Sequence, residues 1–402
     1  MKICFVSMLT LDTDLHKTRE LEIAKALVKR GHAVTLMGMI STRRFQLSKS
    51  RVNLISIPIR YVPVISPIIW IIFLFLFLPI YVLIREPDFI VMAPDASVVG
   101  SVPASLFSRF IGVKFVLDTR STPVEVIGFR MHLSEIMFTI AFLVAKLLFS
   151  GLAAVTSSMK AEVCTKFDLD QNRAAVWTNG VDIDLFNPKK CQSESIKLKE
   201  QLNLTKKFVV FYHGAFSPSR GLTEAVESMQ IVAQHCPSVV LFLLGKGTTV
   251  SILKELTRKN SLQNNVILHD VVPYEEVPKF IGLADVCIVP LPDNYYWRFQ
   301  NALNLLEYLA MEKVVLATDI VANRAIVDDE KCCIYLKSVK PKDIAESIET
   351  AYFNKGKLDC WGKSGRKIIQ KNYTWEKVAE NVEHYLLSIE MSKRRKKCSS
   401  GS

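Results

Sequence analysis

The sequence lacks the residue patterns that mark metal centres and disulfide-rich domains. Its nine cysteines include no C-x-x-C pair, and its seven histidines form no H-E-x-x-H set. We therefore expect reduced thiols and neither a metal nor another cofactor. No apolar signal core follows the short strand predicted at residues 2–6, and no RNA- or DNA-binding motif accompanies the net charge of +12. These absences favour an intracellular protein without a nucleic-acid partner.

Charge is also missing from one long internal segment. Residues 61–84 carry no charged side chain, and the run Ile68–Leu78 with its flanks is long enough to span a bilayer. A span would separate the first two strands from the strand predicted at 88–92, although all three should share one sheet. Pro67 and Pro79 also interrupt the segment. Three interpretations remain: a span, a buried core helix, and a segment that dips into the membrane or lies along it, which we favour.

Two further features favour a membrane surface. Residues 137–152 are largely apolar, with Lys146 as their only charge, and the basic cluster Lys393–Lys397 closes the last predicted helix. A basic residue near an anionic leaflet contributes about 1 kcal/mol of attraction. Such a tail can also be simply solvated or bind nucleic acid. We expect a peripheral or monotopic protein at the cytoplasmic face of the cell membrane, bound to its anionic surface, with both termini cytoplasmic.

Strands and helices alternate along the whole chain, which predicts parallel sheets. The 402 residues exceed what one core comfortably holds, so we expect two α/β domains. The first covers residues 1–185 and includes the apolar segment. The second covers 186–373, and residues 374–402 form a terminal helix and the basic tail.

The stretch from Ala302 to Asp319 sets one carboxylate in an apolar helix that leads into a strand. Leucines and an alanine recur at helical spacing around Glu307, which places Glu307 at the edge of a buried face. Open α/β sheets bind ligands at the carboxyl ends of their strands, and two carboxylate oxygens can accept hydrogen bonds from a ribose 2'- and 3'-OH. The alternative is a solvated helix glutamate.

A second candidate site follows the predicted strand Val209–Gly214. A short loop with Ser217 and Arg220 leads to an amphipathic helix. Gly214 lets backbone approach a diphosphate, the helix N-terminus attracts its charge, and Arg220 can pair with it. An ordinary strand-turn-helix with a surface arginine is the alternative.

The first predicted domain has a polar cluster of its own. The strand that begins at Lys114 ends in Asp118, Arg120 and Glu125, which we expect to point toward the cleft between the domains. A structural Asp-Arg pair that fixes a loop is the alternative.

Several motifs together resemble a known family. Glu307-Tyr308-Leu309-Ala310 and Lys313-Val314-Val315 match the pattern P-x-K-L-x-E-Y-x-A-x-G-K-P-V-V, and residues 179–186 match N-G-V-D-x-x-x-F. The chain thus resembles the retaining nucleotide-sugar glycosyltransferases of family 4, which have the GT-B fold of two Rossmann-like domains facing a central cleft. Asn304 replaces a frequent lysine, and Phe299 replaces the first glutamate of the paired E-x7-E motif. Asp12-Thr13-Asp14 stand where relatives have a glycine-rich loop.

The resemblance implies specific roles for residues of this chain. Asp118 and Arg120 would lie near the reacting sugar, as catalytic residues together with Arg220 and Glu307. The terminal helix would pack back on the first domain, and residues 271–274 would hold the nucleobase. The implied donor-binding residues are Gly214, Ser217, Arg220, Gly245, Val272, Tyr274, Asn304, Leu305, Leu306 and Glu307.

The resulting hypothesis is a hexosyltransferase-type enzyme. It would move a sugar from a nucleoside-diphosphate sugar to a hydroxyl of a lipid-linked or glycan acceptor, with retention and without a metal, in glycan or glycolipid biosynthesis. The sequence names neither donor nor acceptor, and it leaves front-face attack and a covalent intermediate open. A sugar-nucleotide epimerase of the same fold and a non-catalytic nucleotide-sugar-binding subunit are the alternatives, the latter because of Phe299 and Asn304.

Overall fold

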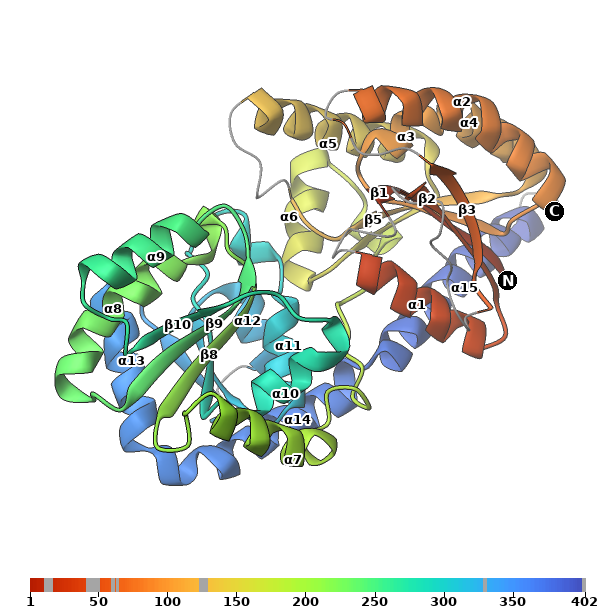
Figure 1. Ribbon diagram of the computed structural model, residues 1–402. Helices are drawn as coiled ribbons and strands as arrows, with labels where there is room; N and C mark the ends of the chain where they lie inside the picture. Colours follow the sequence, from red (N-terminus) through yellow and green to blue (C-terminus); the bar gives the residue numbers. More distant parts are fainter. Residues whose placement is uncertain are drawn as a thin grey trace. The chain divides into compact units, whose positions relative to one another are not determined.

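The computed structural model describes residues 1–10, 17–40, 51–58, 62, 65–122, 129–327 and 331–399. The chain divides into two compact units (Figure 1). The first, the N-terminal unit, comprises Met1–Asn179 and Trp375–Ser402, and the second, the C-terminal unit, comprises Gly180–Thr374. Asp12-Thr13-Asp14 and Glu125 lie outside the described residues.

The N-terminal unit is built on a parallel sheet with the strand order β3-β2-β1-β4-β5-β6-β7. Its strands are β1 (Lys2–Thr10), β2 (Ala33–Ile40), β3 (Asn53–Pro58), β4 (Phe89–Met92), β5 (Lys114–Thr119), β6 (Gly151–Ala154) and β7 (Ala174–Val176). Its helices are α1 (Lys17–Lys29), α2 (Ile65–Arg85), α3 (Ala96–Gly100), α4 (Val102–Ile111), α5 (Phe129–Leu148), α6 (Ser157–Phe167) and α15 (Trp375–Ser399). This order is the Rossmann order, in which the chain changes direction between β1 and β4.

Helices cover both faces of this sheet. Helices α1 and α15 pack against each other on one face, where α15 buries Trp375, Val378, Val382 and Leu386. Helices α2 to α5 lie on the opposite face (Figure 1). The last helix of the chain therefore completes the core of the unit in which the chain begins.

The C-terminal unit repeats the same architecture with the order β10-β9-β8-β11-β12-β13. Its strands are β8 (Phe208–Ala215), β9 (Val239–Lys246), β10 (Val266–His269), β11 (Val286–Val289), β12 (Val314–Thr318) and β13 (Cys333–Leu336). Its helices are α7 (Pro188–Gln201), α8 (Leu222–His235), α9 (Val250–Lys259), α10 (Val277–Gly282), α11 (Leu303–Ala310), α12 (Val321–Val327), α13 (Pro341–Phe353) and α14 (Leu358–Asn372). All described strand pairs are parallel. The prediction of two Rossmann-like parallel-sheet domains is confirmed.

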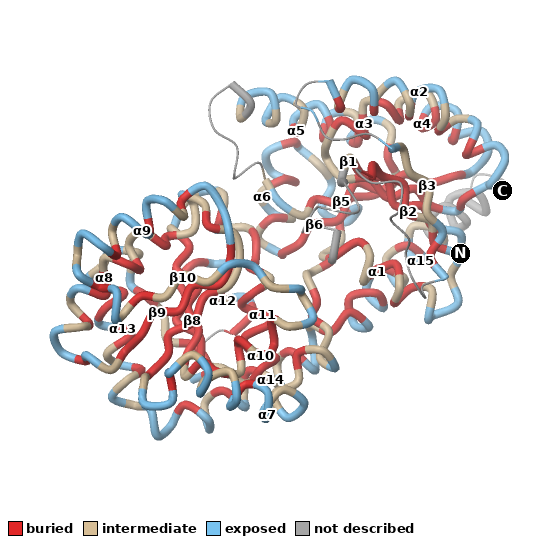
Figure 2. Tube along the Cα trace, in the orientation of Figure 1, coloured by how far each residue is buried: buried red, intermediate tan, exposed pale blue. Residues whose placement is uncertain are grey.

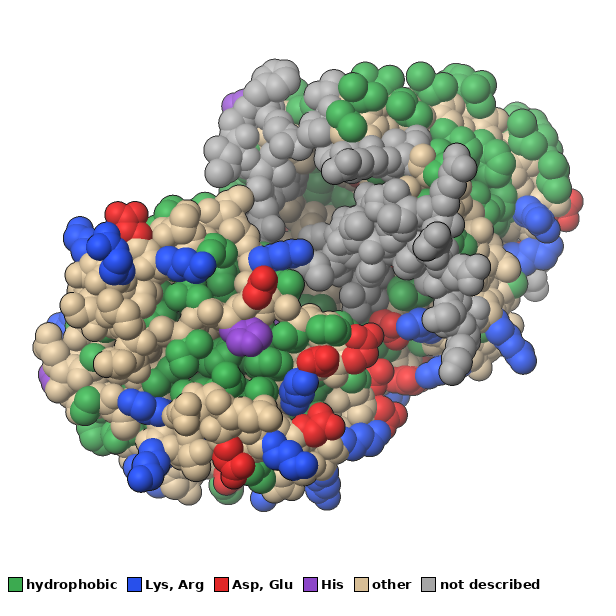
Figure 3. Space-filling view, viewed as in Figure 1, with side chains coloured by type: hydrophobic (Ala, Val, Ile, Leu, Met, Phe, Trp, Pro, Cys, Tyr) green, Lys and Arg blue, Asp and Glu red, His purple; other side chains and the backbone are tan. Residues whose placement is uncertain are grey.

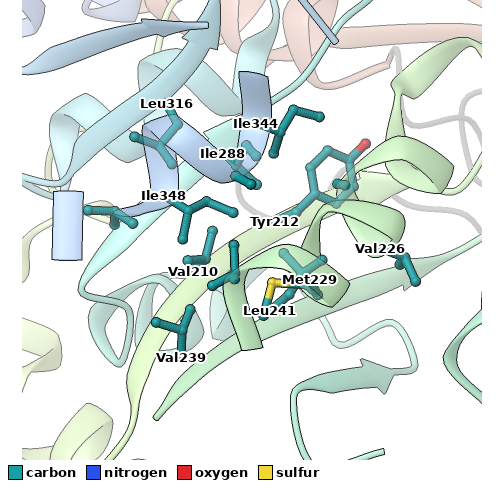
Figure 4. Close-up of a cluster of buried hydrophobic side chains, with 14 of the residues drawn as sticks. Val210, Tyr212, Val226, Met229, Val239, Leu241, Ile288, Leu316, Ile344 and Ile348 are labelled. Carbon is teal, nitrogen blue, oxygen red and sulfur yellow. The ribbon is translucent and has the colours of Figure 1, made fainter. Parts of the chain in front are cut away.

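The core of the C-terminal unit lies between this sheet and helices α8 and α13. Figure 4 shows Val210 and Leu241 of the sheet among Met229 of α8 and Ile344 and Ile348 of α13. The central strands are buried on both faces, which explains why their sequences are continuous apolar runs rather than alternating ones. The carboxyl ends of β8 and β11 flank the point where the strand order reverses, so a ligand is expected there.

Candidate donor-binding site

The loop after β8 is held against the end of β11. Gly221 has φ +66°, and a Cβ at this position would collide with the carbonyl oxygen of Pro290. Only glycine fits such a left-handed, closely packed position. The loop residues Pro218–Arg220 form a short 3-10 turn, and α8 begins at Leu222 directly behind them. The first amide groups of α8 therefore lie next to Arg220, as the sequence predicted for an anion site.

Arg220 stacks on a tryptophan that the sequence reasoning missed. Its guanidinium carbon lies 4.6 Å from the ring centre of Trp297. The Trp297 indole N–H donates to the carbonyl oxygen of Ser219 at 2.9 Å, and Trp297 is only 5% exposed. An arginine held flat on an aromatic ring is restricted to a few orientations. The hydroxyl oxygens of Ser217 and Ser219 lie 3.2 Å apart.

Glu307 is a buried carboxylate with two protein donors. It lies in α11 and is 2% exposed, which excludes a solvated helix glutamate. His213 Nε2 lies 2.8 Å from Oε2, and the Tyr274 hydroxyl donates to Oε1 at 2.7 Å. A carboxylate has about four lone-pair sites, so each oxygen can still accept one more hydrogen bond. Glu307 is thus oriented before any ligand arrives.

Tyr308 orients His213, and His213 in turn orients Glu307. The Tyr308 hydroxyl accepts from the backbone N–H of His213 at 2.8 Å and lies 3.0 Å from Nδ1. Burial raises the pKa of Tyr308 well above its ordinary value, so this hydroxyl keeps its proton. With Nδ1 facing the Tyr308 hydroxyl and Nε2 facing Glu307, the His213 ring is held at both nitrogens.

The turn with the N-G-V-D-x-x-x-F pattern supports the same carboxylate from the other side. Phe186 is fully buried and packs edge-to-face on Tyr274, with ring centres 5.5 Å apart. The backbone of Phe186 is held by Arg366, whose guanidinium donates to its carbonyl oxygen at 2.7 Å. The motif therefore positions Glu307 through Tyr274, in addition to turning the chain.

The start of α11 contains polar groups that lack partners. Asn304 donates through Nδ2 to the His213 carbonyl oxygen at 3.1 Å, while its Oδ1 is buried without a hydrogen-bond partner. Gln300 Nε2 is in the same situation. Leu305 and Leu306 are fully buried in the core, and the Leu305 N–H donates to the Ala302 carbonyl oxygen at 3.2 Å. The side chain of Leu305 is therefore apolar and buried, and its amide already donates a hydrogen bond within the protein.

The other predicted donor-binding residues lie at the same edge of the sheet. Gly214 ends β8, and Gly245 pairs with it in β9. Val272 and Tyr274 follow β10. Lys313, by contrast, is structural: its ammonium donates to the carbonyl oxygens of Gly282 and Ala284 at 3.1 and 2.6 Å, and burial lowers its pKa.

Asp118 and Arg120 lie in an ionic cluster of the N-terminal unit. Asp118 is fully buried in the N-terminal unit. Its Oδ2 accepts from Arg19 Nη1 at 2.5 Å and from Arg120 Nε at 3.2 Å. Arg120 also pairs with Glu20, which accepts from the Ser7 hydroxyl at 3.0 Å. Asp118 therefore belongs to a buried ionic cluster, as in the alternative interpretation of a structural Asp-Arg pair.

Among the described residues, no group of three or more His, Cys, Asp or Glu side chains comes together in a way that could hold a metal ion.

Two family models match this chain. The family model described as glycosyl transferases group 1 matches residues 194–368, and that described as glycosyltransferase family 4 matches residues 18–185. The two matches cover one unit each. The chain belongs to the glycosyltransferase family that these two models describe, one for each half. Glu307 is thus a carboxylate with two protein partners, while Tyr308 and Lys313 hold neighbouring segments in place.

Individual relatives of this glycosyltransferase are distant. The capsular polysaccharide biosynthesis glycosyltransferase CapM of Staphylococcus aureus is 24% identical over 308 residues, which are 74% of this chain and 76% of CapM. A GDP-mannose-dependent phosphatidylinositol monomannoside mannosyltransferase of Mycobacterium tuberculosis is 20% identical over 52% of this chain and 54% of its own. The structure of HepE from Anabaena in complex with UDP aligns over 96% of this chain and 100% of its own, with a TM-score of 0.76 and 17% identity.

Sequence reasoning missed His213, Trp297 and Phe186 as parts of the site. His213 directly precedes Gly214 at the end of a predicted strand, which is the position from which a side chain reaches a ligand. Trp297 lies in a loop of aromatic residues without periodicity, so only the fold reveals its contact with Arg220.

Proposed function

We propose that the chain transfers a sugar from a nucleoside diphosphate donor to a hydroxyl group of a lipid-linked or glycan acceptor. The observation that carries the proposal is the preoriented carboxylate of Glu307, which lies in the same unit as Arg220 and the N-terminus of α8. A carboxylate that can accept two hydrogen bonds fits a ribose diol, and a guanidinium beside a helix N-terminus fits a diphosphate. A nucleoside diphosphate presents both groups.

The relatives support this class of donor without naming one. HepE was solved with UDP, and the mycobacterial relative is named for GDP-mannose. Their nucleobases differ, and the chemistry they share is the ribose and the diphosphate. We therefore propose a nucleoside-diphosphate sugar as donor and assign no base.

Departure of the diphosphate requires compensation of the negative charge that develops on it. We propose that Arg220 and the first amides of α8 supply this compensation. Asn304 contributes a neutral amide where relatives have a lysine, so Arg220 carries more of the charge in this chain. Family resemblance supports retention at the anomeric carbon.

Glu307→Gln is the direct test of the donor site. The amide nitrogen of glutamine cannot accept the bond from His213 Nε2 or Tyr274, and one acceptor for the ribose diol is lost. Because hydrogen bonds to charged groups contribute about 1.5–3 kcal/mol, we expect affinity for UDP or GDP to fall roughly tenfold or more. Isothermal titration calorimetry measures this directly.

The matched control is Glu255→Gln on the exposed side of α9, which should leave nucleotide affinity unchanged. A folded Glu307→Gln protein with wild-type affinity for both nucleotides would show that Glu307 does not hold the ribose.

A non-catalytic nucleotide-sugar-binding subunit is the second candidate, because Phe299 and Asn304 depart from the family pattern. Incubation of the protein with membranes and a panel of labelled nucleotide sugars separates the possibilities. Transfer of label to a lipid or glycan supports the enzyme. Tight binding without turnover supports the subunit, and conversion of the donor without a glycoside product supports an epimerase.

We also propose that transfer needs no divalent metal. The support is Arg220 beside the N-terminus of α8, groups that would meet the charge of the diphosphate in place of a metal. We expect labelled-sugar transfer to persist at nearly its full rate in EDTA. Loss of transfer in EDTA that Mg²⁺ or Mn²⁺ restores would overturn this proposal.

Finally, we propose that the enzyme acts at the cytoplasmic face of the membrane. The support is the apolar character of α2 and α5, both long and apolar enough to cross a membrane, together with the basic sequence at 393–397. The mycobacterial relative is named for a lipid acceptor, which fits an acceptor drawn from a membrane.

A further inference from the structure

Large exposed apolar side chains gather on three helices of the N-terminal unit. Helix α2 exposes Leu76 (64%) and Ile84 (72%), α4 exposes Phe110 (87%), and α5 exposes Ile136 (55%) and Leu147 (72%). We call the outward surface of α2, α4 and α5 the three-helix face. Figure 2 shows exposed residues along α2, and Figure 3 shows hydrophobic side chains gathered over this helix. Apolar patches of this extent are rare on soluble monomers and mark interaction sites.

The three helices are neighbours. Helix α4 packs against both α2 and α5, and all three lie on the same side of the sheet (Figure 1). On α5 the exposed apolar residues recur every three or four positions, as Leu133, Ile136, Ile140, Leu143 and Leu147. This spacing places them in one stripe along the outer side of the helix. The face is therefore continuous from α2 to α5.

Helix α2 is fixed along its length against the protein. Trp70 is fully buried and donates through its indole N–H to the Ser97 hydroxyl at 2.8 Å. A Cβ on Gly100 of α3 would lie 2.8 Å from Leu74 Cβ, so α2 and α3 are in close contact. The strands before and after α2, β3 and β4, belong to the same sheet. A helix bound sideways in this way lies along the domain surface and does not cross a bilayer alone.

The outward side of α2 offers almost nothing for a protein partner to hydrogen-bond, whereas α5 also exposes polar side chains, among them His132 and Glu135. Between Ile65 and Ile84 the polar side chains are Ser66, Trp70 and Tyr81, and all three are buried. Protein interfaces typically contain about one hydrogen bond per 100–200 Å². The outward side of α2 therefore matches hydrocarbon chains better than another protein. Arginines lie near the ends of these helices. Arg85 is the last residue of α2, and Arg109, near the end of α4, donates to the Leu147 carbonyl oxygen at 2.6 Å, near the end of α5.

We propose that the three-helix face is embedded in one leaflet of a lipid bilayer, with α2 parallel to the membrane plane. Helices in such a position insert their apolar side about 5–10 Å into the headgroup and acyl boundary. The proposal deepens the membrane location given above and rests on it. It adds the surface, its orientation, and the role of α4, which is too short to span a bilayer.

The test is flotation of the full-length protein with phosphatidylcholine vesicles, with and without phosphatidylglycerol. The variant combines Ile84→Ser, Phe110→Ser and Leu147→Ser, one from each helix and each more than two-thirds exposed, so the core is untouched. We expect wild-type protein to float in high salt as well, because apolar insertion is not screened. We expect the affinity of the variant for the vesicles to be lower by roughly tenfold or more.

The matched control combines Ile196→Ser, Ile252→Ser and Phe353→Ser, which are exposed on helices of the C-terminal unit, and should float like wild type. Equal flotation of variant and wild type would overturn the three-helix face while leaving a membrane location intact. No flotation of the wild type would overturn both. A wild-type dimer that the variant converts to monomers, without flotation, would assign the face to a second copy.

Orientation is tested separately with a fluorescent amino acid at Ile69, Leu76 or Ile84 and quenchers at known depths in the lipid. An in-plane helix gives similar, shallow depths at all three positions. A deep Leu76 between shallow ends would overturn the in-plane orientation.

Discussion

Arg220→Ala should lower sugar transfer roughly tenfold to hundredfold. Arg220 is the guanidinium that follows β8, stacked 4.6 Å from the centre of the Trp297 ring, beside the N-terminus of α8. Negative charge on the diphosphate grows as the glycosidic bond to it breaks, so a cation placed there stabilises the transition state more than the bound donor. We therefore expect kcat to fall more than donor affinity. Initial rates across a donor titration give both quantities.

Two variants make the Arg220 result specific. Arg298→Ala removes a nearby guanidinium that pairs with Asp293 at 2.6 Å and is half exposed, and it should change the rate by less than about twofold. Arg220→Lys keeps the charge but loses the planar fork and the stacking, so its rate should be intermediate. Wild-type kinetics in a folded Arg220→Ala protein would remove Arg220 from the proposed mechanism.

The sequence predicted those parts of the site that depend on local pattern. The strand before Gly214, the loop with Arg220 and the helix that carries Glu307 follow from apolar spacing and glycine positions. The partners of Glu307 do not, because His213 and Tyr274 come from other segments, 94 and 33 residues away. Periodicity places Glu307 beside a buried face but does not show that tertiary contacts cover it.

The apolar segment shows the same limit. Helix α2 is apolar all round, so its sequence does not reveal which side packs against the protein. From sequence, Trp70 and Phe77 are equally good candidates for a membrane-facing side chain. In the structure Trp70 is fully buried against Ser97, whereas Leu76 and Ile84 are exposed. The side of α2 that becomes buried is the side that packs on α3, where Gly100 permits close approach.

Asp118 was predicted to face a substrate because it ends a strand at the ligand edge of the sheet. The structure places Asp118 near the end of β5 and also shows that its carboxylate is buried. Arg19 comes from α1, 99 residues earlier, and no local pattern links it to Asp118. Once the two meet, the carboxylate is covered and its charge is balanced inside the unit.

Asp118→Ala should therefore destabilise the N-terminal unit by about 3–5 kcal/mol, because it leaves the buried guanidinium of Arg19 without its partner. The side chains of Arg19 and Asp118 are 6% and 1% exposed, so water cannot replace the lost carboxylate. Hydrogen exchange at the amides of β1 and β5 measures the local free energy of opening, which matters because the two units need not unfold together.

Controls separate this structural role from catalysis. Asp293→Ala breaks the half-exposed pair with Arg298 and should cost less than about 1 kcal/mol. The double variant Arg19→Met with Asp118→Leu should recover part of the stability, because the unpaired buried charge causes most of the loss. Unchanged exchange at β1 and β5 in Asp118→Ala, combined with lost transfer, would instead return Asp118 to the substrate-facing role that its place at the strand end first suggested.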